Sequence, residues 1–388
     1  MMYTAEMFCH NNSLYNSNGA LEYVSKEKAF NMGYIGSGIE FSADCGGDVM
    51  INFKLPAIGS YREFFSDKAS IVRFHTLRFK LWVDGIQQED LLINDKYVAS
   101  HNLIIASGLK FGTHTFKIIR ATEATVARKF YLCGVVLDGN LLNVSQKQRP
   151  YIEVYGDSIS SGYGNISSRE YTAFNKDDSN YVFVKDGYLV DPSTEGAVKT
   201  LNNSEYNFED GTKTYAYIAA QNLGADISVF SKSGLGITVY GGKAEESTET
   251  MLKWYPNLPI NKNADYVIIN HITNDSKYYN MAAGLTKEGL SNAYVEFIKR
   301  VRADHKNASI IVIYGMMAVR SPEEDYYLTG EEVVLNAVDR VKKIDAEVYA
   351  LKLPRGNQGG MGHPSNDEHI IASRCLEQFL LGHMDKTI

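Results

Sequence analysis

The sequence predicts an α/β protein in which a parallel sheet covered by helices follows an all-β sandwich. One observation behind this prediction is a change of periodicity near residue 147, and another is the polar segment 145–150 at the same place, which ends in proline. A third is the length of 388 residues, which exceeds one typical core. We therefore expect a first domain over residues 1–147 and a second over residues 148–388.

The first part of the chain has the pattern of an antiparallel sandwich. Apolar and polar residues alternate over the short segments 39–42, 49–53, 77–83 and 114–119. Three pairs of residues that contain glycine predict turns between such strands: Gly46-Gly47, Asp84-Gly85 and Asp138-Gly139. Many short strands with turns between them are typical of a sandwich.

The second part alternates between helical and strand patterns. Apolar residues at helical spacing (Tyr294, Phe297, Ile298, Val301) precede the apolar segment 310–314, and a second such set (Val334, Ala337, Val338, Val341) precedes 348–353. Strands that alternate with helices form parallel sheets covered on their faces. The segment 167–211 shows neither period over most of its length, and we expect a long loop there, either a wall or lid over a site or a surface insertion.

Composition excludes several classes of function. Hydrophobic residues make up 44% and charged residues 22%, as in ordinary globular proteins. The net charge of −7 offers no basic face for nucleic acid, and no window of about 18 apolar residues predicts a membrane span. The four cysteines (Cys9, Cys45, Cys133, Cys375) have no CxxC spacing, so we expect free thiols, with neither a metal site nor another cofactor.

The start of the chain predicts a location. Its first ten residues have neither a basic start nor an apolar run, so we expect no signal peptide and a cytoplasmic protein, or a secreted one if a leader preceded this sequence. Asn274-Asp275-Ser276 matches a glycosylation acceptor. A glycan there would block the role argued for Asn274 below, which favours a bacterial source.

The most informative stretch is 151–165, which runs from a strand into Gly156-Asp157-Ser158 and a glycine-rich turn. Ser158 would lie at the carboxyl end of a parallel strand, where open α/β sheets bind ligands. Two interpretations stand on these residues alone: a nucleophilic serine, or an ordinary helix cap, for which Asp and Ser are both preferred.

A nucleophilic serine needs a base and oxyanion donors, and later segments offer both. His363 lies in a glycine-rich loop before the last helix, and a histidine side chain in water has a pKa of about 6.5, suitable for a general base. Gly234 follows the strand 227–230 and Asn274 follows the strand 266–269, where a backbone N–H and an amide can donate to an oxyanion. Each segment alone is more often a strand-terminating turn.

Together these segments resemble the four sequence blocks of the SGNH, or GDSL, hydrolases. Gly156-Asp157-Ser158-Ile159, Gly234, Thr273-Asn274-Asp275 and His363-Pro364 match the blocks in order. The resemblance implies a three-layer, flavodoxin-like hydrolase domain in which Ser158 is the nucleophile and His363 the base. It also implies that Ser158, Gly234 and Asn274 form the oxyanion hole.

The first part of the chain, with its closing segment from Thr122-Glu123 to Asp138-Gly139, is similar to carbohydrate esterase family two. This resemblance implies an amino-terminal jelly roll and metal-free removal of acetyl groups from plant oligosaccharides and polysaccharides. Tyr163, beside the nucleophile, is a candidate substrate-binding residue that can stack on a sugar ring or else pack the loop.

Two positions depart from the pattern of the resemblance. Gly360 stands where the wider group has an aspartate three residues before the histidine, so we expect a Ser158–His363 dyad oriented by a backbone carbonyl of residues 356–362. The acids Asp367 and Glu368 are expected to act on the last helix instead. Ile272 replaces a usual glycine and is expected to narrow the site.

Four functions remain open on the sequence, and the last of them belongs to a different class from the other three. The first is a carbohydrate O-acetyl esterase, and the others are a sugar O-acetyltransferase, a short-chain lipid esterase and a non-catalytic carbohydrate-binding protein. The expected partner is an acetylated carbohydrate, not nucleic acid or membrane. A zinc site built from His271 and Asp275 is disfavoured because residues spaced i, i+4 ligate from a helix, whereas these two follow a strand.

Overall fold

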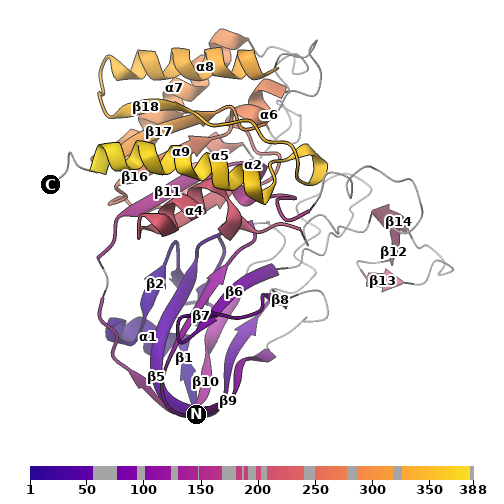
Figure 1. Cartoon of the computed structure of the whole chain (residues 1–388), viewed down its shortest axis with the longest axis vertical. Coiled ribbons are helices and arrows are strands. Elements are labelled where there is room, and N and C mark those ends of the chain that lie inside the picture. Colours follow the sequence, from indigo (N-terminus) through magenta and orange to yellow (C-terminus); the bar gives the residue numbers. More distant parts are fainter. Residues whose placement is uncertain are drawn as a thin grey trace.

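The computed structural model describes residues 1–55, 77–93, 101–123, 130–146, 148–167, 181–185, 188–190, 198–201, 208–239, 250–277, 286–317 and 326–384. Figure 1 shows an antiparallel β domain at the amino-terminal end of the molecule and a layered α/β domain at the other. Among the described residues, no helix is long and apolar enough to cross a membrane.

The β domain is one antiparallel sheet of ten described strands that folds over on itself around an aromatic core (Figure 1). Its order is β3-β4-β10-β5-β9-β6-β7, with β1 beside β10, β2 beside β5 and β8 beside β6. The strands are β1 (Met2–Thr4), β2 (Asn16–Asn18), β3 (Glu22–Val24), β4 (Ala29–Asn31), β5 (Gly38–Lys54), β6 (Leu77–Val83), β7 (Ile86–Gln87), β8 (Leu91–Ile93), β9 (His101–Arg120) and β10 (Tyr131–Leu142), with helix α1 (Ala5–His10) and a 3₁₀ turn, η1 (Asn12–Leu14), after β1. The predicted all-β domain is confirmed, while its jelly-roll order stays a prediction.

Two of the three predicted turns in this domain are wrong. Asp84 and Gly85, both at positive φ, do turn the chain from β6 into β7. Gly46-Gly47 and Asp138-Gly139 instead lie inside β5 and β10, at shifts of strand register. Such bulges let a long strand bend, and glycine lacks the side chain that would obstruct the bend.

The α/β domain contains a five-stranded parallel sheet in the order β15-β11-β16-β17-β18. Its strands are β11 (Tyr151–Gly156), β15 (Asp226–Ser231), β16 (Tyr266–Asn270), β17 (Ser309–Tyr314) and β18 (Val348–Lys352). Numbered along the chain, this order is 2-1-3-4-5, the flavodoxin-like order whose ligand crevice lies between its first and third strands. The predicted parallel sheet is confirmed, and the crevice is expected between β11 and β16.

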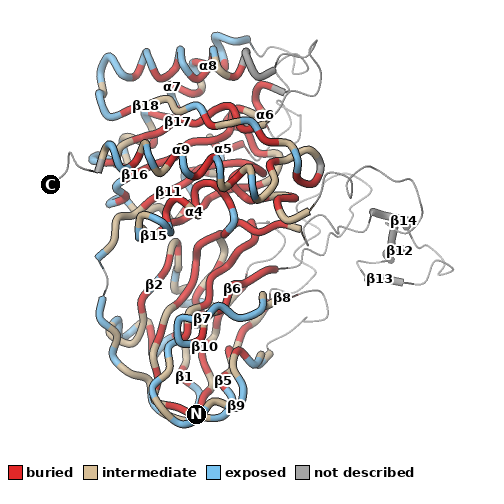
Figure 2. Tube along the Cα trace, in the orientation of Figure 1, coloured by how far each residue is buried: buried red, intermediate tan, exposed pale blue. Residues whose placement is uncertain are grey.

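Helices cover both faces of this sheet and complete three layers (Figure 2). Helices α7 (Lys287–Asp304) and α8 (Tyr326–Lys342) share a core with Val267 and Ile310, whereas α4 (Tyr215–Asn222) and α9 (Asn366–Met384) share one with Ile268 and Ile311. Neighbouring residues of one strand serve opposite faces, as the pleat requires. The shorter helices are α2 (Ser158–Ser161), α5 (Met251–Trp254) and α6 (Ile272–Lys277), with 3₁₀ turns η5 (Gly211–Lys213), η6 (Tyr255–Asn257) and η7 (Gly360–Gly362).

The segment 167–211 contains strands, which corrects the expectation of a continuous loop. Strands β12 (Tyr181–Lys185), β13 (Tyr188–Val190) and β14 (Val198–Leu201) form a small antiparallel sheet. Strand pairing over such short stretches leaves little periodic signal in the sequence. Residues 168–180, 186–187, 191–197 and 202–207 lie outside the described residues, and the wall or lid role stays a prediction.

The two domains pack directly on each other. The N–H of Val229 in β15 donates to Ile35 O at 3.1 Å, and Gly211 N–H donates to Ala121 O at 2.6 Å. Ile35 and Ile119 of the β domain are fully buried in the cluster that includes Val229. The predicted domain boundary falls between β10 and β11, and residue 147 itself lies outside the described residues.

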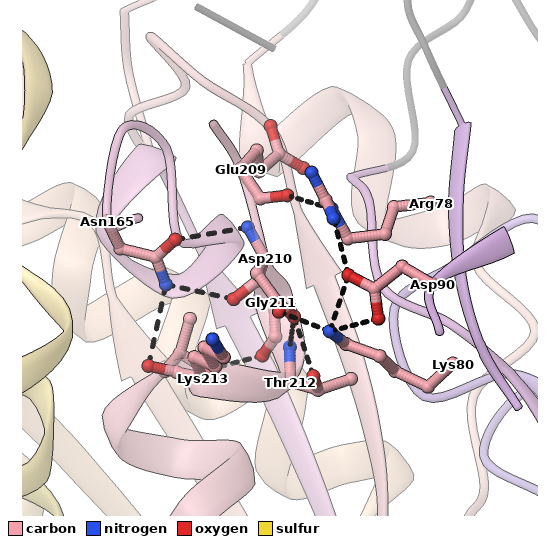
Figure 3. A network of polar contacts seen from close by, with 10 residues as sticks. Arg78, Lys80, Asp90, Asn165, Glu209, Asp210, Gly211, Thr212 and Lys213 are labelled. Carbon is pink, nitrogen blue, oxygen red and sulfur yellow. Dashed lines mark hydrogen bonds and ion pairs between the residues drawn. The ribbon is translucent and has the colours of Figure 1, made fainter. Parts of the chain in front are cut away.

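A buried polar network also joins the domains (Figure 3). Lys80 Nζ of β6 lies 2.6 Å from Asp210 Oδ2 of the α/β domain and 2.7 Å from Asp90 Oδ1, and the Lys80 and Asp210 side chains are 4% and 1% exposed. Arg78 pairs with Asp90 and donates from Nε to Glu209 O at 3.1 Å. The charges of Lys80 and Asp210 therefore compensate each other where water is excluded.

This network reaches the segment that follows helix α2. Asn165 Nδ2 donates to Asp210 O at 2.9 Å, and Asp210 N–H donates to Asn165 Oδ1 at 3.1 Å. Asp210 Oδ1 also accepts from Thr212 N at 3.1 Å, which caps η5. The charge of Lys80 thereby helps to hold residues close to Ser158.

We expect Lys80→Met to lower the free energy of unfolding by on the order of 3 kcal/mol, because it leaves Asp210 buried without its cation. Urea unfolding would measure this. The double variant Lys80→Met/Asp210→Asn should recover part of the loss. The control is Lys287→Met, whose ion pair with Glu332 is about half exposed and should matter by about 0.5 kcal/mol or less. Equal losses from Lys80→Met and Lys287→Met would contradict the prediction.

Candidate active site

The four predicted segments meet at the carboxyl edge of the parallel sheet. Ser158 is the first residue of α2, directly after β11, and Asp157 caps this helix by accepting Ile159 N–H at 2.9 Å. A Cβ on Gly156 would lie 2.2 Å from Ser160 Oγ, so the first turn of α2 requires glycine at that position. The chain can therefore turn sharply enough to present Ser158 at the edge of the sheet.

Ser158 and His363 are in contact. His363 Nε2 lies 2.8 Å from Ser158 Oγ, which is hydrogen-bonding distance for a base and its nucleophile. His363 follows η7. The centroid of the Tyr163 ring lies 4.9 Å from that of the His363 imidazole, and the two ring planes make an angle of 54°. The structure thus brings together three of the predicted site residues and places Tyr163 beside His363.

The His363 loop is held from both of its sides. Gly360 N–H donates to Gly164 O and Asn366 N–H to Asn165 O, each at 2.8 Å, which joins this loop to the turn after α2. Backbone bonds of this kind fix a loop independently of its side-chain rotamers.

Glu368 contributes more than a helix-dipole interaction. Its carboxylate accepts N–H groups of Asn357 at 3.0 Å, Gln358 at 2.9 Å and Ser365 at 2.8 Å. Ser365-x-x-Glu368 is a capping box for α9, a signal readable in the sequence. The carboxylate therefore ties the loop before η7 to the start of α9, while the backbone-oriented dyad stays a prediction.

Gly234 and Asn274, the predicted oxyanion donors, lie on either side of β11, after β15 and β16. Gly234 has a φ of +80°, which favours glycine. Asn274 lies on helix α6 rather than in a turn, and its Nδ2 donates to Asp157 Oδ2 at 3.0 Å and to Leu235 O at 3.1 Å. Both N–H bonds of the amide have acceptors, so an oxyanion must share or replace one of them.

Asp275 holds the turn after β15, residues 234–238, which carries Gly234. Its carboxylate accepts Ile237 N–H at 2.8 Å, Thr238 N–H at 2.9 Å and Thr238 Oγ–H at 2.8 Å. His271 Nδ1 faces Leu235 O at 3.1 Å, and burial lowers the pKa of His271 to about 4. Over the described ranges, no three His, Cys, Asp or Glu side chains gather as metal ligands would. Asp275 does lie on a helix, contrary to the sequence argument.

Ile272 does not narrow the site as expected. Its side chain is buried in the core that α7 and α8 share, where it closely approaches Gly330. An apolar residue at the start of α6 gains more from this burial than from exposure at the site.

Three acids act in ways that the motif did not assign. Asp157 and Asp275 were part of matching blocks and Glu123 of a similar segment. Apart from the cap that Asp157 forms with Ile159, their acceptor roles depend on partners distant in sequence. Glu123 Oε2 accepts Ser233 N–H at 2.6 Å, next to Gly234. No local sequence pattern predicts a hydrogen bond between residues so far apart in the chain.

Comparison with known proteins supplies the family. Residues 152–353, just over half of the chain, match the family described as GDSL-like Lipase/Acylhydrolase. The chain belongs to this family. His363 and α9 lie beyond the residues that match the GDSL-like family.

The cellulase/esterase CelE of Acetivibrio thermocellus is 26% identical over 318 residues, which cover 77% of this chain and 33% of CelE. The chain thus spans about a third of the length of that relative.

Two solved structures resemble the whole chain. The family two carbohydrate esterase from Clostridium thermocellum in complex with cellohexaose has a TM-score of 0.72 and 21% identity, covering 96% of this chain and 99% of that one. The acetyl xylan esterase Est2A of Butyrivibrio proteoclasticus has a TM-score of 0.71 and 17% identity, covering 100% and 99%. At these identities the similarity establishes a shared fold, including the β domain.

The buried Asp157 predicts a pH dependence of stability. Burial raises its pKa to about 7 from 3.8, with Asp275 adding to the rise, against the hydrogen bonds from Ile159 and Asn274. The folded protein then binds a proton that the unfolded chain releases between about pH 4 and 7, so Asp157 stabilises the fold at low pH and loses that contribution as pH rises.

We therefore expect the unfolding free energy of the wild type, relative to Asp157→Asn, to fall by on the order of 3 kcal/mol from pH 4.5 to pH 8. Urea unfolding of both proteins at several pH values measures this difference and cancels groups common to both, such as Glu153. A difference that stays constant, or grows with pH, would show that Asp157 is ionised throughout.

Proposed function

We propose that this protein is a carbohydrate O-acetyl esterase that acts through a serine acyl-enzyme. The observation that carries the proposal is the 2.8 Å contact between Ser158 Oγ and His363 Nε2 at the carboxyl edge of a flavodoxin-like sheet. Membership of the acylhydrolase family supports ester chemistry. The names of the related structures support an acetylated sugar as substrate.

The first step transfers the Ser158 proton to His363 Nε2 as Ser158 Oγ attacks the acetyl carbonyl carbon. The carbonyl π electrons move to oxygen and create an oxyanion. Donors for that oxyanion are the N–H groups of Ser158 and Gly234 and the amide of Asn274. When the tetrahedral intermediate collapses, the sugar oxygen leaves with the proton from His363.

The second step removes the acetyl group from Ser158. A water molecule gives a proton to His363 and attacks the acetyl carbon, and the returning proton frees Ser158 as acetate departs. A sugar hydroxyl in place of water would give a transferase by the same route. Tyr163 borders this position, where its ring supports His363 and can also meet a sugar ring.

The Ser158–His363 contact favours catalysis over a non-catalytic carbohydrate-binding protein, because a binding site has no need of a base at hydrogen-bonding distance from a serine. A short-chain lipid esterase remains a weaker candidate, since no amphipathic interfacial helix was found in the sequence.

We expect Ser158→Ala to reduce kcat for p-nitrophenyl acetate to about a thousandth of wild type or less, because the nucleophile is lost. The matched control is Ser160→Ala, which removes a hydroxyl from the same helix. Ser160 Oγ contacts Tyr215 Oη at 3.1 Å, so this control should keep kcat within about fivefold. Substantial activity of folded Ser158→Ala would refute the serine mechanism.

Acetylated xylo-, cello- and manno-oligosaccharides would define the substrate. Mass spectrometry should show loss of acetyl groups with wild type and none with Ser158→Ala. Acetylation of an added unmodified oligosaccharide, without release of acetate, would assign transfer instead. Ester hydrolysis confined to lipid acetates would contradict the carbohydrate assignment.

Asn274→Ala should lower kcat by on the order of 10²–10³ with little change in KM, because its amide acts on charge that develops in the transition state. Steady-state kinetics with p-nitrophenyl acetate separate the two parameters. A rise in KM at unchanged kcat would make Asn274 a substrate-positioning residue, whose amide keeps its hydrogen bonds to Asp157 and Leu235 during the reaction.

A further inference from the structure

The turn that carries Gly234 is held by an acid from the other domain. Glu123 lies just beyond β9, in the β domain, and is 2% exposed. Its Oε2 accepts Ser233 N–H at 2.6 Å and Ser233 Oγ–H at 2.8 Å. Residue 233 immediately precedes Gly234, so the contact bears directly on an oxyanion donor.

The direction of the Gly234 N–H depends on Ser233. The peptide group between the two residues is planar, so the carbonyl carbon of Ser233 and the N–H of Gly234 turn together. Gly234, at a φ of +80°, lies in a region open to glycine and imposes little restraint of its own. Anchoring Ser233 at two atoms therefore orients the donor.

The same carboxylate oxygen also reaches the nucleophile helix. Ser161 Oγ lies 2.9 Å from Glu123 Oε2 and 2.9 Å from Ser231 Oγ. Ser161 is the last residue of α2, and Ser158 is the first. One acid thus links the element that carries the nucleophile to the turn that carries the oxyanion donor.

Glu123 is itself held rigidly. Arg120 Nη2 donates to Glu123 O at 2.8 Å, and Arg120 Nε donates to Thr122 O at 3.0 Å. Glu123 N–H donates to Glu209 Oε1. A carboxylate can orient other groups only if its own position is fixed by hydrogen bonds such as these.

Burying the Glu123 carboxylate costs free energy of folding unless the hydrogen bonds that it accepts offset the cost. Burial raises the pKa of Glu123, while the donors of Ser233 and Ser161 favour its ionised form. An apolar residue would close the domain interface without that cost.

We propose that Glu123 is a positioning residue through which the β domain orients the oxyanion hole. The inference rests on the proposed serine mechanism and adds to it that the β domain takes part in catalysis by holding Ser233 and α2. Glu123 does not touch the substrate and acts through the Ser233–Gly234 peptide.

The test is Glu123→Met, which keeps the length of the side chain but has no oxygen that could accept from Ser233 or Ser161. We expect kcat for p-nitrophenyl acetate to fall tenfold or more while KM changes less than about twofold, as for a misplaced oxyanion donor. The affinity for a boronic acid, whose adduct with Ser158 carries an oxygen in the hole, should fall in parallel.

The matched control is Glu209→Gln, which alters the same buried cluster but does not contact Ser233. A glutamine there can still accept Glu123 N–H through its carbonyl oxygen, so kcat should stay within about threefold. Unfolding measurements on both variants separate folding from catalysis. Equal kcat losses in the two variants, or a Glu123→Met enzyme with wild-type kcat, would overturn the proposal.

If Glu123→Met does not fold, Ser161→Ala/Ser233→Ala decides, because it removes two of the three donors and keeps the acid. A tenfold loss of kcat is expected, and a loss below twofold overturns the proposal. Failure of the serine mechanism would appear separately, as activity that survives in Ser158→Ala.

Discussion

The hydrogen bond between Ser158 and His363 joins residues 205 positions apart, and the rest of the site is arranged to maintain it. It requires the segment after β11 and the loop after β18 to stay at a fixed distance from each other. Backbone bonds from Gly360 to Gly164 and from Asn366 to Asn165 provide this. They need close approach: a Cβ on Gly164, at a φ of +67°, would lie 2.7 Å from Gly360 O. The contact between Ser158 and His363 therefore also depends on the lack of a side chain at Gly164.

Buried acids perform the corresponding task for the turn at residues 233–238 and for Asn274 of α6. Asp275 binds Ile237 and Thr238, Glu123 binds Ser233, and Asp157 binds Asn274. Each carboxylate accepts N–H groups whose directions it thereby restricts, and in a medium of low polarity such bonds are strong. An apolar contact would be cheaper to bury but would leave the turn free to rotate. Burying these acids thus lowers the free energy of unfolding somewhat but fixes the directions of the N–H groups, which electrostatic preorganisation requires.

What could be predicted from sequence depended on whether the signal was local. Ser158 and His363 could be predicted as site residues because their blocks are short and contiguous, and α7 and β17 because periodicity reports burial directly. Gly46-Gly47 was misread because bends in a long strand are set by the sheet around it. The roles of Glu123 and Asp210 were invisible, since each depends on a partner from the other domain. Glu368 lay between these cases: its capping box was readable, but its bonds to Asn357 and Gln358 were not.

The interface between the domains resembles a core rather than a contact of two modules. Ile35 and Ile119 of the β domain are buried together with Val229, so separation would expose apolar surface. Separation would also break the Lys80–Asp210 pair and the Val229–Ile35 hydrogen bond. Domains joined by small polar contacts move relative to each other by default. Here apolar burial and buried polar bonds oppose such motion together. A β domain held in this way can transmit its position to Ser233 and Asn165 without a hinge, which a tethered sugar-binding module could not do.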